Sequence, residues 1–399
     1  MVSERIVTTC KRMGEAGDMA CLDDCAMKGI HSVFSDHRLQ LGEALPKADE
    51  AILDIAVLDM HHGWPNLGHH SLVQAVREAA CDFEPAIRKA KLKIRVFSFD
   101  VRKHAMLPEP PGGRFSVYIG TGGPGHLDPR LNDGAADFSQ GVKEDPGWEP
   151  RAFRLFDAIL ADPGASLLAV CHSFGVLCRW SGIAEPRQRA EEKGGKSAGI
   201  VLNALTDGAA SHPWFKGLAR DAGSSRIKVI DSRLFDLIPD SVALKRVQPL
   251  SFEVLTKGGS VGEALTGVEF ARDASGTMPR VMGVNHHPEI MEGGRQELII
   301  ESQWEHREVT RAWYEERMSV VTQGIRDPAT AQQLAITTGF TLVWPLRFHL
   351  VKNLRLRAER LNRAFDMHED AIIDQRFADR RARVRSETPV LAAALMSEP

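Results

Sequence analysis

The sequence predicts an α/β protein with a mainly parallel sheet, helices on both faces of that sheet, and a C-terminal helical region. Three observations carry this prediction. Short apolar segments alternate with helix-like stretches from about residue 50 to residue 290, strand signals largely stop after about residue 295, and 43% hydrophobic content is enough for a sizeable core. We divide the 399 residues into an N-terminal extension (1–50), an α/β domain (51–294) and a helical region (295–399).

The expected strands are short apolar segments, and helical patterns lie between them. They lie at 51–60, 93–101, 115–120, 166–171, 225–231 and 280–285. "SLVQAVREA" and "WEPRAFRLFDAILA" have the apolar spacing of helices. In such sheets ligands bind beyond the carboxyl ends of the strands, so the residues that follow the strands are the first candidates for a functional site.

The C-terminal region is expected to be helical. One helix is predicted at 295–321, a second opens with Asp327 as N-cap and Pro328 at its first position, and a third covers 345–366. Their apolar side chains are too many to leave in water. We expect these helices to pack on the α/β core or to form a homo-oligomer interface.

Composition narrows the class of partner and the compartment. A net charge of −3 favours neither nucleic acid nor an anionic membrane surface. No apolar run approaches the roughly 20 residues of a membrane span, and the N-terminus lacks the apolar stretch of a secretory signal, so we predict a cytoplasmic protein. Six cysteines are too few for a disulfide scaffold and are expected to be thiols.

Cys171 is placed where a nucleophile would lie. It ends the apolar segment "SLLAVC" and precedes a helix, and the small residues Ala169 and Ser173 stand two positions before and after it, as a sharp strand-to-helix turn requires. The start of that helix would stabilise a thiolate through its dipole and free N–H groups. The alternative from this segment alone is a buried structural thiol.

"GVNHHPEI" offers a base and its orienting group. His287 and Glu289 are two residues apart, so in an extended segment they project to the same side, with Pro288 fixing the backbone between them. A carboxylate beside an imidazole fixes its tautomer and stabilises the imidazolium, the third role in a triad of nucleophile, base and orienter. Taken alone, such a pair more often means a surface ion pair.

The glycine-rich segment "IGTGGPGHLDP" follows the expected strand at 115–120. It lacks the Gly-Lys-Ser/Thr ending of a nucleotide P-loop. Its place favours an oxyanion loop, in which the backbones of Gly122 and Gly123 join the N–H of His172 in binding a tetrahedral intermediate. The alternative is a plain turn.

Two histidine and cysteine clusters do not point to a metal. "HHGWPNLGHH" at 61–70 has no carboxylate or thiol at matching spacing, and a polar loop that lines the substrate pocket explains it better. The spacing of the second cluster fits no familiar zinc finger; its members are Cys10, Cys21, Cys25 and His31. We therefore predict no metal and no other cofactor.

In order and spacing, "TGGPG", "AVCHSFG" and "GVNHHPE" resemble the motifs of class I glutamine amidotransferases, over roughly residues 50 to 292. The resemblance implies a flavodoxin-like core, an amidotransferase-like domain at 51–294, and a triad of Cys171, His287 and Glu289. The family carries Gly two residues after the cysteine and Gln four after it, where this chain has Ser173 and Gly175. Because that Gln helps to hold the substrate glutamine, its loss puts glutamine in doubt.

Three functions remain open at this point. The first is a cysteine enzyme that acts on glutamine or a related amide through a thioester. The second is a catalytically silent amidotransferase-like protein that binds or regulates a partner. The third is a homoserine acyltransferase-like enzyme, which shares the Cys, His and Glu machinery but uses an acyl thioester. No acceptor-activating module is visible, so any ammonia produced would be used by a partner synthase subunit.

Overall fold

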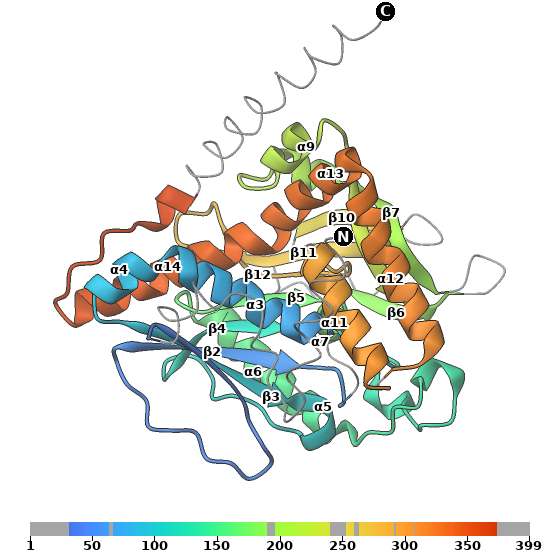
Figure 1. Cartoon of the computed structure of the whole chain (residues 1–399), viewed down its shortest axis with the longest axis horizontal. Coiled ribbons are helices and arrows are strands. Elements are labelled where there is room, and N and C mark those ends of the chain that lie inside the picture. The colour runs from blue at the N-terminus through green and yellow to red at the C-terminus, as the bar shows by residue number, and fades with distance from the viewer. Residues whose placement is uncertain are drawn as a thin grey trace, which may run out of the picture.

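The computed structural model describes residues 32–63, 67–189, 196–239, 253–258, 263–290, 293–307 and 309–372. Within them a ten-stranded sheet runs through the molecule in the order β1-β3-β2-β4-β5-β12-β11-β10-β7-β8, and β6 pairs with β9 in a small second sheet (Figure 1). The strands are β1 (Phe34–Arg38), β2 (Ile52–Asp59), β3 (Lys93–Asp100), β4 (Phe115–Gly120), β5 (Ser166–Val170), β6 (Ala184–Gln188), β7 (Ser197–Leu205), β8 (Arg226–Arg233), β9 (Phe235–Pro239), β10 (Glu253–Gly258), β11 (Ala264–Arg272) and β12 (Pro279–Val284).

The parallel part of the sheet has the strand order of flavodoxin-like proteins. Numbered along the chain from β2, its adjacent strands β3, β2, β4, β5 and β12 stand in the order 2-1-3-4-5. β1 extends this part by pairing in parallel with β3, so the described end of the expected 1–50 extension joins the sheet. β11, β10, β7 and β8 continue it with antiparallel pairing. The mainly parallel α/β sheet predicted from the sequence is confirmed.

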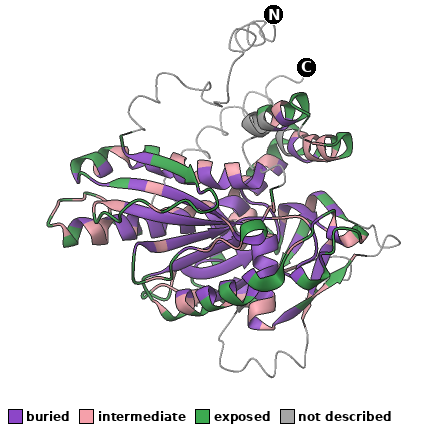
Figure 2. Ribbon diagram, turned by 90° about the horizontal axis from the view of Figure 1, so that it is seen from below, coloured by how far each residue is buried: buried purple, intermediate pink, exposed green. Residues whose placement is uncertain are grey.

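Helices cover both faces of the sheet. Alternate residues of the central strands point to opposite sides: Ile55 and Val57 join one apolar cluster, and Ala56 and Leu58 the other. The first face is covered by α3, α4 and α14, and the second by α6 and α7, so the strands are buried between helical layers (Figure 2). The helices are α3 (Leu67–Asp82), α4 (Glu84–Lys89), α5 (Val101–His104), α6 (Glu149–Ala161), α7 (His172–Ser181), α8 (Asp207–Ser211), α9 (Lys216–Ala222), α11 (Gly293–Glu305), α12 (Arg311–Arg326), α13 (Pro328–Thr338) and α14 (Trp344–Arg360).

The C-terminal helices pack on the α/β core. α14 lies beside α3 over the parallel strands, while α12 and α13 lie against β7 and β8 (Figure 1). The single helix expected at 295–321 is two helices. α11 ends at Glu305, and α12 begins after Thr310, whose side chain caps it by accepting from the N–H of Trp313. Asp327 caps α13 with Pro328 in its first turn, as predicted.

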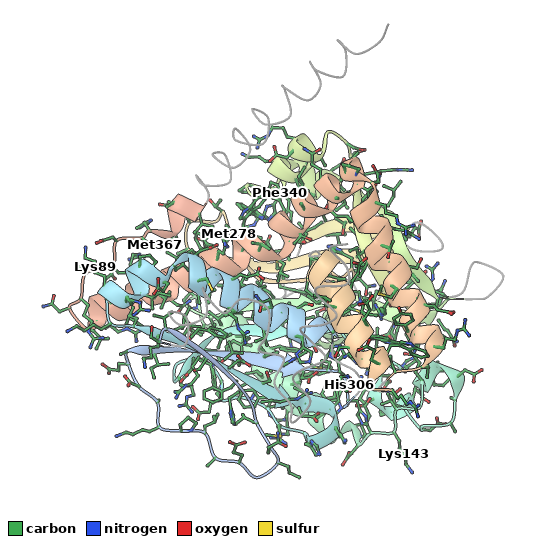
Figure 3. All side chains as sticks on the ribbon, viewed as in Figure 1. Lys89, Lys143, Met278, His306, Phe340 and Met367 are labelled. Carbon is green, nitrogen blue, oxygen red and sulfur yellow. The ribbon has the colours of Figure 1, made fainter. Side chains whose placement is uncertain are left out.

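α13 and α14 are joined by a π-helical turn at Gly339–Val343 into one helical rod. Contrary to the expectation of no span-length apolar segment, Pro328–Arg360 is long and apolar enough to cross a membrane, but 72% of its most apolar window is buried inside the molecule. Phe340 in the turn and Met278 in the loop before β12, both labelled in Figure 3, are completely buried in the same apolar cluster. The rod is a core helix of the fold.

Candidate active site

The candidate site lies at the edge of the sheet where β2, β4, β5 and β12 end. Gly120 at the end of β4 pairs with Ala169 on β5, and Val284 at the end of β12 pairs with Val170. The three loops that follow these strands therefore start side by side at one level. This register brings together segments that lie up to about 170 residues apart in the sequence.

Cys171 occupies a sharp turn between β5 and α7. Its backbone has φ 50° and ψ −101°, a region that side-chain-bearing residues rarely adopt, and its N–H donates to the carbonyl of Val284 at 2.8 Å. Ser173 fixes the turn from the other side, because its N–H and its hydroxyl both donate to the carbonyl of Thr121, at 3.2 and 2.6 Å. This is the elbow expected from the sequence, and it lifts the thiol above the sheet edge.

His287 and Glu289 lie together beyond the end of β12. The backbone N–H of His287 donates to Ile230 on β8 at 2.8 Å, and its Nδ1 lies 2.8 Å from Oε1 of Glu289, with both side chains buried. Its neighbour His286 points elsewhere, with its Nε2 3.4 Å from the hydroxyl of Thr341. Of the two adjacent histidines, only His287 lies at the Cys171 cavity.

The ring of His287 lies between Glu289 and Cys171. Burial alone would lower its pKa, but the negative charges of Glu289 and of a Cys171 thiolate outweigh burial and raise the pKa to about 10. Its Nε2 is buried and has no hydrogen-bond partner among the described residues, while the thiol of Cys171 lies 3.9 Å from the carbonyl oxygen of Ser232. The imidazole is therefore held by its carboxylate, and the Cys171 side chain acts on its charge as a second negative group.

The glycine-rich loop passes close to both residues. A Cβ atom at position 122 would lie 3.1 Å from Cε1 of His287, and one at position 123 would lie 2.1 Å from the carbonyl oxygen of Met60, so glycine is needed for this approach. Arg102 holds the loop by donating from Nη1 to the carbonyls of Met60 and Pro124, at 2.9 and 2.6 Å. Buried Glu144 balances its charge.

His172 is the first residue of α7 and is buried beside the same loop. Burial, followed by the charge of Arg102, lowers the pKa of its ring well below the usual range, and the ring hydrogen-bonds the backbone of Gly123. Its backbone N–H stands in the first turn of the helix, where such groups have no intrahelical partner. His172, Gly122 and Gly123 thus adjoin the space above Cys171.

A cavity of about 120 Å³ opens over the thiol. Its walls come from the loops at the sheet edge, from the turn after β8, and from α12 of the C-terminal region. The lining residues are His61, Leu67, Gly68, Gly123, Pro124, Gly125, Leu127, Gln140, Cys171, His172, Lys196, Ser232, Arg233, Leu234, Phe235, Asn285, His287, Ile290, Trp313 and Arg317. The cavity has room for a small substrate group.

The histidine cluster at 61–70 does not assemble a metal centre. His61 lines the cavity, with Nδ1 3.0 Å from the buried carboxylate of Asp59, whereas Nε2 of buried His69 lies 2.7 Å from the hydroxyl of Ser98. Among the residues that the structure describes, no group of three or more His, Cys, Asp or Glu side chains is placed to hold a metal ion. Cys10, Cys21, Cys25 and His31 lie outside the described residues.

Sequence reasoning missed three residues that line the cavity, Arg233, Trp313 and Arg317. Arg233 follows a strand that was expected, but nothing in "DSRLFDLIP" indicates that its side chain borders the thiol. Trp313 and Arg317 are four residues apart and so share one face of a helix, a spacing that could have marked a functional face. Only the docking of α12 against β7 brings that face to the cavity.

Comparison with known proteins finds similarity in fold alone. No protein-family model and no curated protein matches the chain. A glutamine amidotransferase structure from Thermotoga maritima is 14% identical, with 76% of this chain and 98% of that chain covered and a TM-score of 0.42. The glutaminase domain of Trypanosoma brucei CTPS with bound acivicin is 10% identical (70% and 94%, 0.35), and a putative GMP synthase subunit from Thermoplasma acidophilum is 14% identical (64% and 98%, 0.33).

Proposed function

We propose that this chain is a cysteine-dependent acyl-transfer enzyme of the amidotransferase type, with Cys171 as nucleophile, His287 as base and Glu289 as its orienter. The observation that carries the proposal is the strained turn at Cys171 next to a buried His287–Glu289 pair. A backbone with φ 50° at a non-glycine residue costs free energy, and such strain is typical of residues whose side chain must be held for chemistry. A merely structural thiol needs neither the turn nor the imidazole.

The proposed reaction proceeds through a thioester. In the resting site His287 holds the proton of the Cys171 thiol as an imidazolium, and the thiolate sulfur attacks the carbonyl carbon of the substrate. The N–H groups of Gly122, Gly123 and His172 bind the oxyanion of the tetrahedral intermediate. His287 then gives its proton to the leaving group, the bond from carbon to the leaving group breaks, and water or an acceptor cleaves the thioester.

The surroundings of Gly175 argue against glutamine as the best substrate. The amidotransferase family carries a substrate-holding Gln there, but a Cβ atom at position 175 would lie 2.5 Å from Cδ2 of Leu127. Leu127 is buried and lines the cavity, so an apolar side chain fills space next to the thiol. We propose another amide, or an acyl thioester as in the homoserine acyltransferase-like alternative.

The proposed chemistry also suggests a partner subunit and a cytoplasmic location for this protein. An amide substrate releases an amine or ammonia, whose productive use requires an acceptor site on a partner subunit. The cytoplasm keeps a reactive thiol reduced, and we place the protein there.

Intact-protein mass spectrometry tests the proposal. The full chain is incubated separately with glutamine, with a chloroketone analogue of glutamine and with an acyl-CoA, and Cys171→Ala serves as the matched control. We expect a covalent adduct on Cys171 with at least one reagent and none in the variant. If no reagent modifies Cys171, the catalytically silent binding protein is the better description.

A further inference from the structure

The wall of the Cys171 cavity carries three cationic side chains, Lys196, Arg233 and Arg317. No Asp or Glu is among the described residues that line it. Placing three cations around a small cavity is unfavourable unless an anion compensates them, inside the protein or on a ligand. Which of the three has a protein partner therefore decides whether a ligand is needed.

Two of the three cations have carboxylate partners. Nζ of Lys196 lies 3.2 Å from Glu316, whose other oxygen lies 3.5 Å from the hydroxyl of Ser232. Arg233 is buried between two carboxylates: its Nη1 lies 3.4 Å from Asp231 and its Nε 3.1 Å from Asp236. Nη1 forms no hydrogen bond among the described residues. Nη1 is thus held by an ion pair, and its hydrogen-bonding capacity is not used by the described residues.

Arg317 lacks such a partner. Its guanidinium lies over the ring of Trp313, 5.9 Å from the ring centroid, which orients the group without neutralising it. Among the residues that the structure describes, its buried Nε has no hydrogen-bond partner and no carboxylate forms an ion pair with this side chain. Arg317 is half-buried, so only its buried Nε lacks both water and a partner, and an anion in the cavity would supply that partner.

We propose that Arg317 and Arg233 form a carboxylate-binding subsite of the Cys171 cavity, so that the substrate carries a carboxylate at a distance from its reacting carbonyl group. The inference rests on the proposed function of Cys171 and names its substrate class. A guanidinium edge fits a carboxylate through two parallel hydrogen bonds.

The subsite also gives the C-terminal region a role in the site. Arg317 and Trp313 both belong to α12, which lies beyond the segment that resembles an amidotransferase. The thiol, its base and the glycine-rich loop all come from the α/β core, whereas the unpaired cation comes from this helix. Recognition of the substrate and its chemistry are therefore carried by different parts of the chain.

The test uses thiol reagents that differ only in charge. Cys171 in the full chain is alkylated with iodoacetate and 3-iodopropionate, and in parallel with their neutral amides, and its labelling is followed by mass spectrometry. Arg317→Gln should slow the anionic reagents at least about tenfold and leave the neutral ones unchanged, because a charge-assisted contact contributes at least that factor. His287 is the same in both proteins, so the difference isolates Arg317. Arg311→Gln, an exposed arginine of the same helix, should change neither rate.

A protection experiment identifies the anion. Glutarate should slow the labelling of Cys171 by iodoacetamide in the wild type but not in Arg317→Gln, whereas neutral glutaramide should not protect. An unchanged ratio of anionic to neutral rates in Arg317→Gln would overturn the subsite, and protection by inorganic phosphate but not by glutarate would overturn its assignment to carboxylates. The ratio is measurable even if Cys171 proves no more reactive than an ordinary thiol, so failure of the proposed function and failure of the subsite are separate results.

Discussion

Leu127 fills the space into which any side chain at position 175 would project. The Cβ atom of such a side chain would lie 2.5 Å from Cδ2 and 2.6 Å from Cδ1 of Leu127, far inside van der Waals contact. Gly175 lies in α7 and Leu127 in the loop that follows β4, so their fit is a property of the folded site. Restoring the amidotransferase Gln at position 175 therefore requires a change at position 127 as well.

We expect Gly175→Gln alone to destabilise the protein by about 1–3 kcal/mol through overpacking and to leave ammonia release from glutamine at its baseline. Gly175→Gln combined with Leu127→Ala should recover stability, because alanine lacks the clashing atoms, and should raise ammonia release. Urea unfolding and an ammonia assay measure the two effects. Leu131→Ala, at an exposed leucine nearby, is the control for Leu127. Higher glutaminase activity in the single variant would contradict this account.

Cys171 should alkylate faster than the other described cysteines. Burial raises the pKa of the Cys178 thiol, and burial together with Glu78 raises that of Cys81, whereas the Cys171 thiol lies next to His287, whose raised pKa supplies a positive charge. We expect labelling by iodoacetamide roughly tenfold faster at Cys171 than at Cys81, and a comparable loss of rate in His287→Ala. Peptide mapping against time measures both. Equal labelling rates at Cys171 and Cys81 would show that the Cys171 thiol is not activated.

The imidazolium of His287 should persist far above neutral pH. Its pKa in the folded protein is about 10, above its ordinary 6.5, so the folded state holds this proton more tightly than the unfolded state. The resulting stabilisation is fully present below pH 6.5 and is lost as the pH rises toward 10. NMR of the histidine rings should show a midpoint near 10 in the wild type and a lower one in Glu289→Gln. An unchanged midpoint in that variant would show that Glu289 does not hold the ring.

The rod formed by α13 and α14 should be needed for stability. Phe340 is fully buried between Trp214 and Trp344, with ring centroids 5.2 and 5.0 Å away. Phe340→Ala should cost about 3–5 kcal/mol of unfolding free energy, measured by denaturant titration. Leu202→Ala, at an exposed leucine on β7, should cost far less. Similar losses in the two variants would mean that the rod does not form part of the core.

The parallel half of the fold, apart from β1, was predictable because its strands are short, apolar runs followed by turns. β5 is buried along its whole length, and the matching segment stands out in the sequence. β7 was not predicted, because its burial pattern is irregular and only its partners β8 and β10 define it as a strand. An antiparallel extension of this kind depends on tertiary pairing, which local patterns do not carry.

The residues of the candidate site likewise fall into those that the sequence predicts and those that only the fold reveals. Cys171, His287 and Glu289 each follow a strand and carry their chemistry in their local spacing, so the sequence points to them. Leu127 and Arg317 do not, because their significance comes from what lies opposite them in the folded chain. A sequence pattern can identify a nucleophile and its base, whereas the walls that select a substrate are set by packing.

At the Cys171 turn, the residue that would make the backbone most stable is not the residue that supplies the thiol. A φ of 50° with ψ −101° penalises every side chain at this position by an amount of order 1–3 kcal/mol, a penalty that glycine alone avoids. A selection for thermal tolerance, blind to turnover, would thus favour Cys171→Gly among single changes at this residue. The same replacement deletes the sulfur. Stabilising this protein for use must therefore exclude position 171 and draw its gains from elsewhere, since the proposed nucleophile sits on a strained backbone.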